Sequence, residues 1–240
     1  MYGYRERIGL ILPSTNTVME SELSRMVPEG ISVHTTRVKL TATNPEGLKA
    51  MSVNAERAVD ELESCLSDVI IYGCTSGSFL QGMDWDDQFR TRLQSLASAR
   101  ILTTSYACRL ALQAMGRRKI AIATPYIDSL NDAAKGYFTA AGYEIVNIKG
   151  LGIEVASNIG KNPPHISYRL GKEVVTAETE LLFLSCTGFR TMEIVERLEQ
   201  DLGIPVITSN GASLWAAMRS HGIKEQLQGY GSLFQLSYPL

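Results

Sequence analysis

Two apolar runs in the chain end in the same dipeptide. Residues 69–73 lead into Cys74-Thr75, and residues 181–185 lead into Cys186-Thr187. A continuous run of β-branched and large apolar residues that stops at small, turn-forming residues is typical of a strand covered on both faces in a parallel sheet. Each cysteine is therefore expected at the carboxyl end of a buried strand, where open α/β sheets bind their ligands.

The same succession of elements occurs twice. The strand-like runs that begin at Ile8 and Ile120 are 112 residues apart, and so are Cys74 and Cys186. A Thr-Ser pair that precedes an apolar helical stretch also recurs, at 104–105 and 208–209. This repetition predicts an α/β fold of two pseudo-symmetric, flavodoxin-like lobes, each a mainly parallel sheet flanked by helices.

The repeated segments also suggest where the two lobes divide. Residues 1–105 together with 214–240 are expected to form the first lobe, which holds Cys74, and residues 106–213 the second, which holds Cys186. The tail from Ile223 onwards is expected to pack back on the first lobe. If the lobes face each other, the two cysteines come from opposite walls of one cleft, where we expect the active site.

The second half contains a long loop. An apolar helical face runs from Pro45 to Leu66, and residues 33–38 and 143–148 suit more exposed strands. After the last of these, residues 150–164 contain Asn158 and end in two prolines, which stop a helix. Loops of this length inside compact domains are often functional.

Composition and charge narrow the class of partner. The 240 residues are 45% apolar and 20% charged with a net charge of -2, and the one basic run, residues 117–119, directly precedes an apolar run. Nucleic-acid binding would need clustered Lys and Arg. The apolar run near the N-terminus stops at Pro13, which is too short for a signal peptide or a membrane span. We expect a cytoplasmic protein that binds a small molecule, with no nucleic-acid or membrane partner, and a homo-oligomer.

Cysteine usage favours reduced thiols. The four cysteines show no CxxC spacing and the three histidines no ligand spacing, which argues against a disulfide framework and a metal site. No GxGxxG, P-loop or GxSxG motif is present, and we expect no cofactor. Cys65 and Cys108 fall on helical stretches and are expected to be packing residues.

Cys74 and Cys186 are the candidate reactive groups. A free cysteine, with a pKa near ~8.5, is mostly protonated at neutral pH, and the start of a helix can favour its anion. Hydroxyl groups beside each sulfur, on Thr75, Ser76 and Thr187, suit a substrate carboxylate or an oxyanion, although they could instead cap helices. Two thiols on opposite faces of a planar carbon could move a proton across it, or one could add to a double bond.

A resemblance to a known family rests on segments such as Pro13-Ser14-Thr15-Asn16-Thr17, Thr124-Pro125-Tyr126 and Ser185-Cys186. They are similar to the aspartate/glutamate racemase superfamily, within it the branch of maleate cis-trans isomerases and arylmalonate decarboxylases. The similarity covers nearly the whole chain. Its most specific parts are Pro13-Ser14-Thr15-Asn16-Thr17, Met19-Glu20, Cys74, Thr124-Pro125-Tyr126, Asn158 and Ser185-Cys186.

The resemblance implies a role for each site residue. Cys74 would add to an alkene carbon and Cys186 would be its acid/base partner. Asn16, Tyr126 and Asn158 would hold the substrate carboxylates, and Thr75-Ser76 is similar to the oxyanion pocket of arylmalonate decarboxylases. The full set of expected substrate-binding residues is Pro13, Ser14, Asn16, Thr75, Ser76, Tyr126, Asn158, Thr187 and Gly188.

The activity that the resemblance implies first is cofactor-independent isomerisation of maleate to fumarate through a covalent Cys74 adduct. The alternatives are a two-base racemase of amino acids or α-substituted acids and a decarboxylase of the arylmalonate type. A protein that binds a dicarboxylate without turnover is a further alternative.

Overall fold

Two four-stranded parallel sheets form the framework of the protein. The computed structural model describes residues 2–40, 42 and 44–236. Within them, the first sheet has the order β2-β1-β3-β4 and the second the order β6-β5-β7-β8. The two parallel sheets agree with the sequence prediction, which did not include the strand order. The strands are β1 (Glu6–Pro13), β2 (Ile31–Val38), β3 (Val69–Tyr72), β4 (Arg100–Thr103), β5 (Lys119–Thr124), β6 (Glu144–Gly150), β7 (Leu181–Leu184) and β8 (Val206–Thr208).

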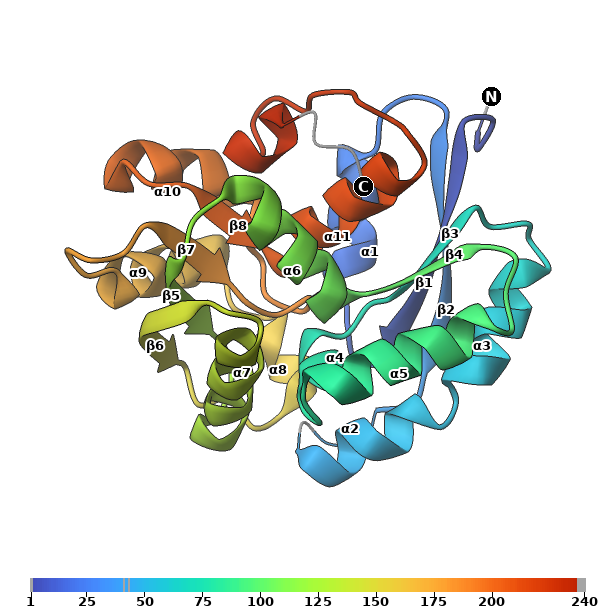
Figure 1. Ribbon diagram of the computed structural model, residues 1–240, viewed down its shortest axis with the longest axis horizontal. Coiled ribbons are helices and arrows are strands. Elements are labelled where there is room, and N and C mark those ends of the chain that lie inside the picture. Colours follow the sequence, from blue (N-terminus) through green and yellow to red (C-terminus); the bar gives the residue numbers. More distant parts are fainter. Residues whose placement is uncertain (1, 41, 43, 237–240) are drawn as a thin grey trace.

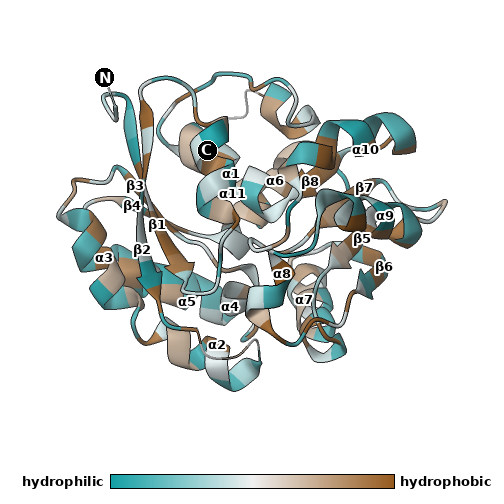
Figure 2. Ribbon diagram, turned by 180° about the vertical axis from the view of Figure 1, so that it is seen from behind, coloured by the Kyte–Doolittle hydropathy of each residue, from teal (hydrophilic) through white to brown (hydrophobic). Residues whose placement is uncertain are grey.

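The two sheets share the same pairing register, which confirms the internal repeat. Ile8 pairs with Val69 in the first sheet, and Ile120 pairs with Leu181, 112 residues further along, in the second. All four residues of β3 and of β7 are buried because helices cover both faces of each sheet. In Figure 2 the apolar strand β1 is brown, whereas the outer helices α3 and α10 carry teal turns.

Helices surround both sheets. In the first half they are α1 (Met19–Met26), α2 (Pro45–Ser52), α3 (Ala55–Glu63), α4 (Thr75–Phe79) and α5 (Met83–Gln94). From there on they are α6 (Thr104–Met115), α7 (Asp128–Ala140), α8 (Ala156–Ile159), α9 (Pro164–Val174), α10 (Val195–Leu202) and α11 (Ser209–Ser220), with short 3-10 helices η1 (Met192–Ile194) and η2 (Ser232–Gln235).

Two details of the helices differ from the sequence prediction. The helical face expected from Pro45 onwards is divided between α2 and α3, and the Asn44 side chain caps α2 by accepting from Gly47 N at 2.9 Å. Cys65 lies in the turn after α3, because the helix ends at Glu63. The long loop 150–164 contains the single helical turn α8.

Helices α6 and α11 pack against each other between the two sheets (Figure 1). Each begins at a threonine whose hydroxyl accepts a backbone N–H, at Thr103 and Thr208. Thr103 directly precedes the first Thr-Ser pair, whereas Thr208 is the first residue of the second pair, so the two pairs are offset by one residue in the structure. Because α11 contacts α6 as well as β3, β4 and β8, it belongs to the interior of the whole molecule. The lobe boundaries at 105/106 and 213/214 stay a prediction.

The C-terminal segment contacts both halves, not the first lobe alone. Arg5 forms an ion pair with Glu225, whereas Ser232 N donates to Glu199 of α10 at 2.9 Å and η2 packs against α6, α11 and β8. The buried Arg219 holds the segment by donating to the carbonyl oxygens of Ile223 and Leu236. A guanidinium with five donors can bind several carbonyls at once.

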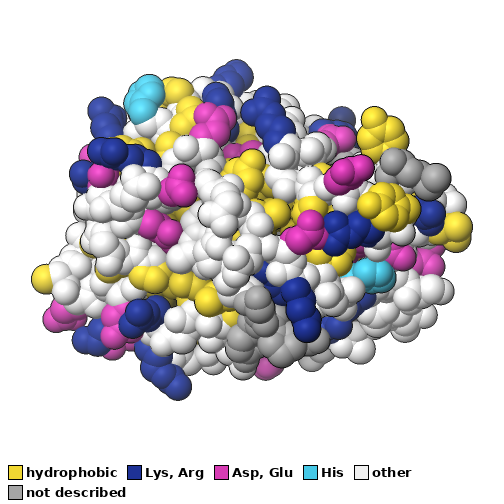
Figure 3. Space-filling model, turned by 90° about the horizontal axis from the view of Figure 1, so that it is seen from above, with side chains coloured by type: hydrophobic (Ala, Val, Ile, Leu, Met, Phe, Trp, Pro, Cys, Tyr) yellow, Lys and Arg dark blue, Asp and Glu magenta, His cyan; other side chains and the backbone are white. Residues whose placement is uncertain are grey.

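The surface carries charges of both signs. Figure 3 shows Lys and Arg side chains interspersed with Asp and Glu over the face seen from above. Among the described residues, no helix is both long and apolar enough to cross a membrane.

Candidate active site

The two predicted cysteines line one cavity. Cys74 follows β3 and Cys186 follows β7, so the carboxyl edges of both sheets contribute to it. The cavity is about 40 Å³ and therefore holds only a few water molecules. Its lining comprises Pro13, Thr15, Asn16, Thr17, Leu40, Cys74, Thr75, Ser76, Tyr126, Ala156, Ile159, Gly160, Cys186, Thr187 and Gly188.

Cys74 is the first residue of the turn that starts α4. Its Sγ accepts a hydrogen bond from Gly77 N at 3.3 Å and lies 3.8 Å from Ser76 Oγ. Glycine at position 77 suits this close approach, because a Cβ there would lie only 3.0 Å from the sulfur. Burial raises the pKa of the Cys74 thiol, while the hydrogen bonds from Gly77 and Ser76 lower it.

Cys186 has a matching sulfur contact but no helix after it. Its Sγ accepts from Gly188 N at 3.3 Å, and its backbone N–H donates to Ser209 Oγ at 3.0 Å. Burial raises the pKa of the Cys186 thiol to about 12, against the hydrogen bonds that favour its anion. Both sulfurs are therefore thiols at neutral pH, because the helix start and the nearby donors do not outweigh desolvation.

Asn16 joins the two halves at the edge of the cavity. Its Oδ1 accepts from Val18 N at 2.9 Å and from Met19 N at 3.1 Å, which fixes the amide at the start of α1. Its Nδ2 donates to Thr187 Oγ1 at 3.0 Å. An amide nitrogen carries two hydrogens, so one remains for a ligand.

The hydroxyls of Thr75 and Thr187 reach across to the other half. Thr75 Oγ1 donates to Ser209 Oγ at 2.9 Å, and Thr187 Oγ1 donates to Gly73 O at 3.1 Å. Neither caps a helix, and each single hydroxyl hydrogen is already used. Donation from Thr75 or Thr187 to a substrate therefore stays a prediction, and it would need one of these bonds to break.

Tyr126 offers a buried hydroxyl to the cavity. Its ring is 1% exposed and packs edge-to-face on Phe79, with ring centroids 5.9 Å apart. The hydroxyl lies near the Cys186 thiol and the Ser185 hydroxyl but makes no hydrogen bond of standard geometry among the described residues. Burial raises its pKa well above the usual value. Buried polar groups nearly always form hydrogen bonds. A ligand oxygen that accepts from this hydroxyl would therefore remove the free-energy cost of burying it without one.

Two predicted site residues lie outside the cavity lining. Ser14 is exposed and accepts from Leu40 N at 3.1 Å. Asn158 is exposed on α8, where its Oδ1 accepts from Lys161 Nζ at 2.9 Å. The single turn of α8 directs its apolar neighbour Ile159 inward instead. Contact of Ser14 or Asn158 with a substrate stays a prediction.

Sequence reasoning missed several residues of the cavity and its support. The apolar liners Leu40 and Ile159 are ordinary core residues in sequence, with no signal to distinguish them. Ser209 was visible as part of the second Thr-Ser pair, but its contacts with both cysteine turns were not. Among the described residues, no Lys or Arg lines the cavity, and no cluster of His, Cys, Asp or Glu could hold a metal ion.

Fold and site define a two-lobed α/β protein with a pair of buried thiols at one cavity. Residues 8–234 match the sequence model for arylmalonate decarboxylase. The chain is 26% identical to a maleate isomerase of Geobacillus stearothermophilus, covering 97% of this chain and 98% of that protein. It is 25% identical to an arylmalonate decarboxylase of Bordetella bronchiseptica, with 96% and 97% covered.

A solved structure agrees with these sequence comparisons. A maleate cis-trans isomerase variant of Nocardia farcinica with a covalently bound succinylcysteine intermediate superimposes with a TM-score of 0.92 at 25% identity, covering 95% of this chain and 98% of that one. The protein belongs to the arylmalonate decarboxylase/maleate isomerase family of the aspartate/glutamate racemase superfamily. The fold and the family expected from the sequence are confirmed.

Proposed function

We propose that the protein is a cofactor-independent isomerase of the maleate cis-trans type. The observation that carries this proposal is the pair of thiols, one after β3 and one after β7, that line a single cavity beside the buried Tyr126 hydroxyl. The succinylcysteine captured in the Nocardia farcinica relative supports covalent chemistry at a cysteine.

The reaction uses the two thiols as a proton-transfer pair. Cys74 Sγ forms a bond to one alkene carbon as it gives up its proton, and the π electrons move to the neighbouring carbon. That carbon takes a proton from Cys186, which recovers one from Cys74. The former double bond rotates, and the transfers then run in reverse. Cys186 takes the added proton back from carbon as it returns its own proton to the Cys74 sulfur, and the C–S bond breaks to release fumarate. Neutral thiols suit this cycle because each step returns the proton that it borrows.

The substrate carboxylates need hydrogen-bond donors. Since no Lys or Arg lines the cavity among the described residues, we assign this role to the free amide hydrogen of Asn16, the Tyr126 hydroxyl and the Ser76 hydroxyl. Backbone N–H groups at the start of α4 add a partial positive charge. Pro13 and Gly188 bound the space, and Ser14, Asn158, Thr75 and Thr187 are the remaining candidates for contact.

A second candidate is a two-base racemase acting beside a carboxylate. It is favoured by the near-equivalence of the two sulfurs, each of which accepts a glycine N–H at 3.3 Å. A racemase needs two such groups on opposite faces of one carbon, whereas an isomerase needs them to act differently.

One experiment separates these activities. The protein is incubated in deuterated water with maleate, with a chiral α-substituted acid, or with a disubstituted malonate, and proton NMR is recorded. Fumarate with little carbon-bound deuterium supports the isomerase, deuterium with inversion supports the racemase, and loss of carbon dioxide supports a decarboxylase. A protein that turns over none of the three substrates contradicts the proposal and favours a non-catalytic binder.

Replacement of the proposed nucleophile provides the matching prediction. Cys74→Ser should lower turnover by about 10³-fold or more, because a hydroxyl is a far weaker nucleophile than a thiol. Cys65→Ser, in the turn after α3, is the control and should retain the activity. Equal activities of the two variants would contradict a role for Cys74.

A further inference from the structure

The two cysteines are held in place by different means. Cys74 begins α4, so the helix itself fixes the geometry of its turn. Cys186 begins the irregular segment 186–191, which reaches no helical structure until η1 at Met192. A catalytic group on an irregular segment needs anchors from outside to hold its geometry.

Glu22 supplies such anchors from the first half of the chain. It lies on α1, which packs against α11 (Figure 1), and its carboxyl group is buried. Glu22 Oε1 accepts from Thr191 N at 3.1 Å and from Met192 N at 3.3 Å. Oε2 accepts from Asn210 Nδ2 at 2.6 Å. The carboxylate thus binds one end of the Cys186 segment directly.

Asn210 extends the contact to the other end of the segment. Its Nδ2 also donates to Thr187 O at 3.1 Å, and the residue is fully buried on α11. Both amide hydrogens therefore go to acceptors, which determines the orientation of the amide, since a flipped group would set oxygen against oxygen. Glu22 and Asn210 together hold Thr187 and Thr191, on either side of Gly188.

The carboxylate of this arrangement has no equivalent beside the first cysteine among the described residues. The internal repeat places Ala134 at the position equivalent to Glu22. The strand register and the helix caps place Ser105 at the position equivalent to Asn210. Ser105 Oγ donates to Thr75 O at 3.1 Å, as Asn210 Nδ2 does to Thr187 O, but Ala134 has no carboxylate to bind the chain beyond Cys74. The acidic side chain and its amide partner thus compensate for the helix that follows Cys74 and is missing after Cys186.

We propose that Glu22, through Asn210 and the backbone of residues 187–192, is a positioning residue that holds the Cys186 thiol opposite Cys74. The effect of Glu22 on catalysis rests on the proposed function. Its effect on the position of the Cys186 thiol is independent of that function. The carboxylate accepts three N–H donors and donates none, so the ionised form fits these partners.

The test replaces Glu22 by glutamine. In Glu22→Gln an NH₂ group must face either Asn210 Nδ2 or the backbone N–H groups of Thr191 and Met192, which opposes donor to donor. We expect kcat to fall at least about tenfold with KM changed by less than about threefold, because a displaced acid/base group affects the chemical step. The control is Glu193→Gln, an exposed carboxylate paired with Arg190 in the same segment, which should behave as the unchanged protein does.

A thiol readout distinguishes positioning from general damage. Peptide mass spectrometry measures the rate at which iodoacetamide alkylates each cysteine. In Glu22→Gln this rate should change at least about fivefold at Cys186 and less than about twofold at Cys74. A folded Glu22→Gln variant with unchanged Cys186 alkylation overturns the proposal. If the unchanged protein turns over no substrate, the proposed function fails while this readout still decides the role of Glu22.

A measurement on the unchanged protein covers the case of a variant that does not fold. Hydrogen exchange should show the amides of Thr191 and Met192 to be protected, because Glu22 accepts from both. Rapid exchange of these two amides would overturn the proposal without any substitution.

Discussion

At the scale of single residues, burial decides the state of the reactive thiols. Cys74 is 5% exposed and Cys186 9% exposed. Desolvation is the largest influence on the pKa of both thiols and raises each of them. The start of α4 beside Cys74 and the Gly188 N–H beside Cys186 moderate the effect without reversing it. The thiolates needed for reaction must therefore form in contact with the substrate.

The raised pKa values predict a steep pH dependence of thiol modification. Because only the thiolate reacts, alkylation of Cys74 and Cys186 should rise about tenfold for each pH unit between pH 7 and 9. Rates are followed by peptide mass spectrometry, with the half-buried Cys65 as a reference for reagent access. A saturating dicarboxylate should slow the reaction at Cys74. A rate that levels off below pH 8 would contradict a raised pKa.

At the scale of elements, sequence patterns predicted the strands and helix starts that depend on local interactions. The buried strands β3 and β7, the two Thr-Ser helix starts and the place of each cysteine followed from apolar runs and turn residues alone. The expectation that the two lobes face each other then predicted one cavity for both cysteines, and both line the same cavity. The repeat at 112 residues then predicted the equivalence of the two sheets.

Contacts between distant elements could not be predicted in this way. Asn16 and Thr187 are 171 residues apart, and Glu22 and Asn210 are 188 apart, with no signal in the sequence to pair them. Likewise, the outward direction of Asn158 depends on the rotation of the single turn α8. Which face of so short a helix points inward is decided by packing and not by its own period.

The bonds between the two cysteine turns predict a loss of stability when one is removed. Thr187→Val keeps the shape of the side chain but leaves Gly73 O and one Asn16 N–H without this partner. The free energy of unfolding should fall by about 1–3 kcal/mol, the cost of leaving buried polar groups unpaired. Chemical denaturation measures the change. Thr139→Val, on the exposed face of α7, should cost less than about 0.5 kcal/mol, and equal losses would contradict this account.

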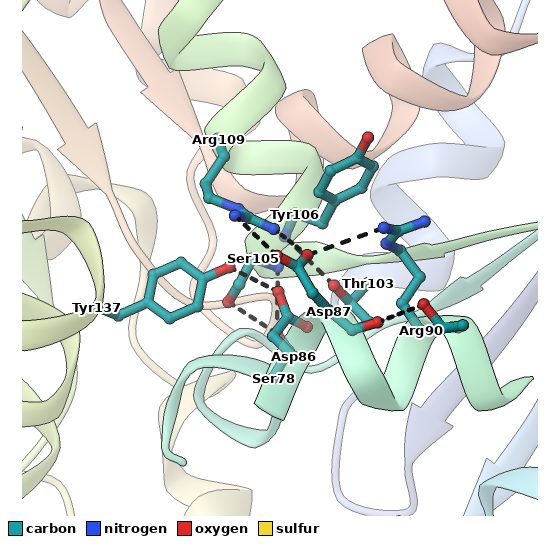
Figure 4. Close-up of polar contacts among 10 residues, drawn as sticks. Ser78, Asp86, Asp87, Arg90, Thr103, Ser105, Tyr106, Arg109 and Tyr137 are labelled. Carbon is teal, nitrogen blue, oxygen red and sulfur yellow. Dashed lines mark hydrogen bonds and ion pairs between the residues drawn. The ribbon is translucent and has the colours of Figure 1, made fainter. Parts of the chain in front are cut away.

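At the scale of the whole molecule, a buried polar contact joins α5 to α7. Figure 4 shows the side chains of Asp86 and Tyr137 pointing toward each other, and Tyr137 donates to Asp86 Oδ2 at 2.6 Å. Asp87 and Arg109 form an ion pair beside them. Tyr137 also packs on Phe79, which in turn packs on Tyr126 of the cavity. The contact thus connects the joint between the two halves with the candidate site.

Asp86 makes the stability of the protein depend on pH. Burial raises the pKa of Asp86 to about 6, while hydrogen bonds from Thr103 and Tyr137 and the charge of Arg109 lower it. A carboxyl group whose pKa is higher in the folded state binds protons more readily there than in the unfolded chain. Its contribution to stability is therefore greatest below pH 4 and decreases up to about pH 6, by on the order of 3 kcal/mol.

Removal of the Tyr137 hydroxyl should enlarge this pH dependence. Tyr137→Phe deletes a donor that favours the ionised form, so the pKa of Asp86 should rise further. The loss of unfolding free energy should be about 1–3 kcal/mol at pH 8 and smaller at pH 4, where Asp86 is protonated in both proteins. Denaturant titrations at the two pH values measure it. Tyr168→Phe removes the same hydroxyl from the partly exposed contact with Asp201 and should lose less than about 1 kcal/mol at either pH. A Tyr137→Phe loss that is equal at pH 4 and pH 8 would show that the hydroxyl does not stabilise the Asp86 carboxylate.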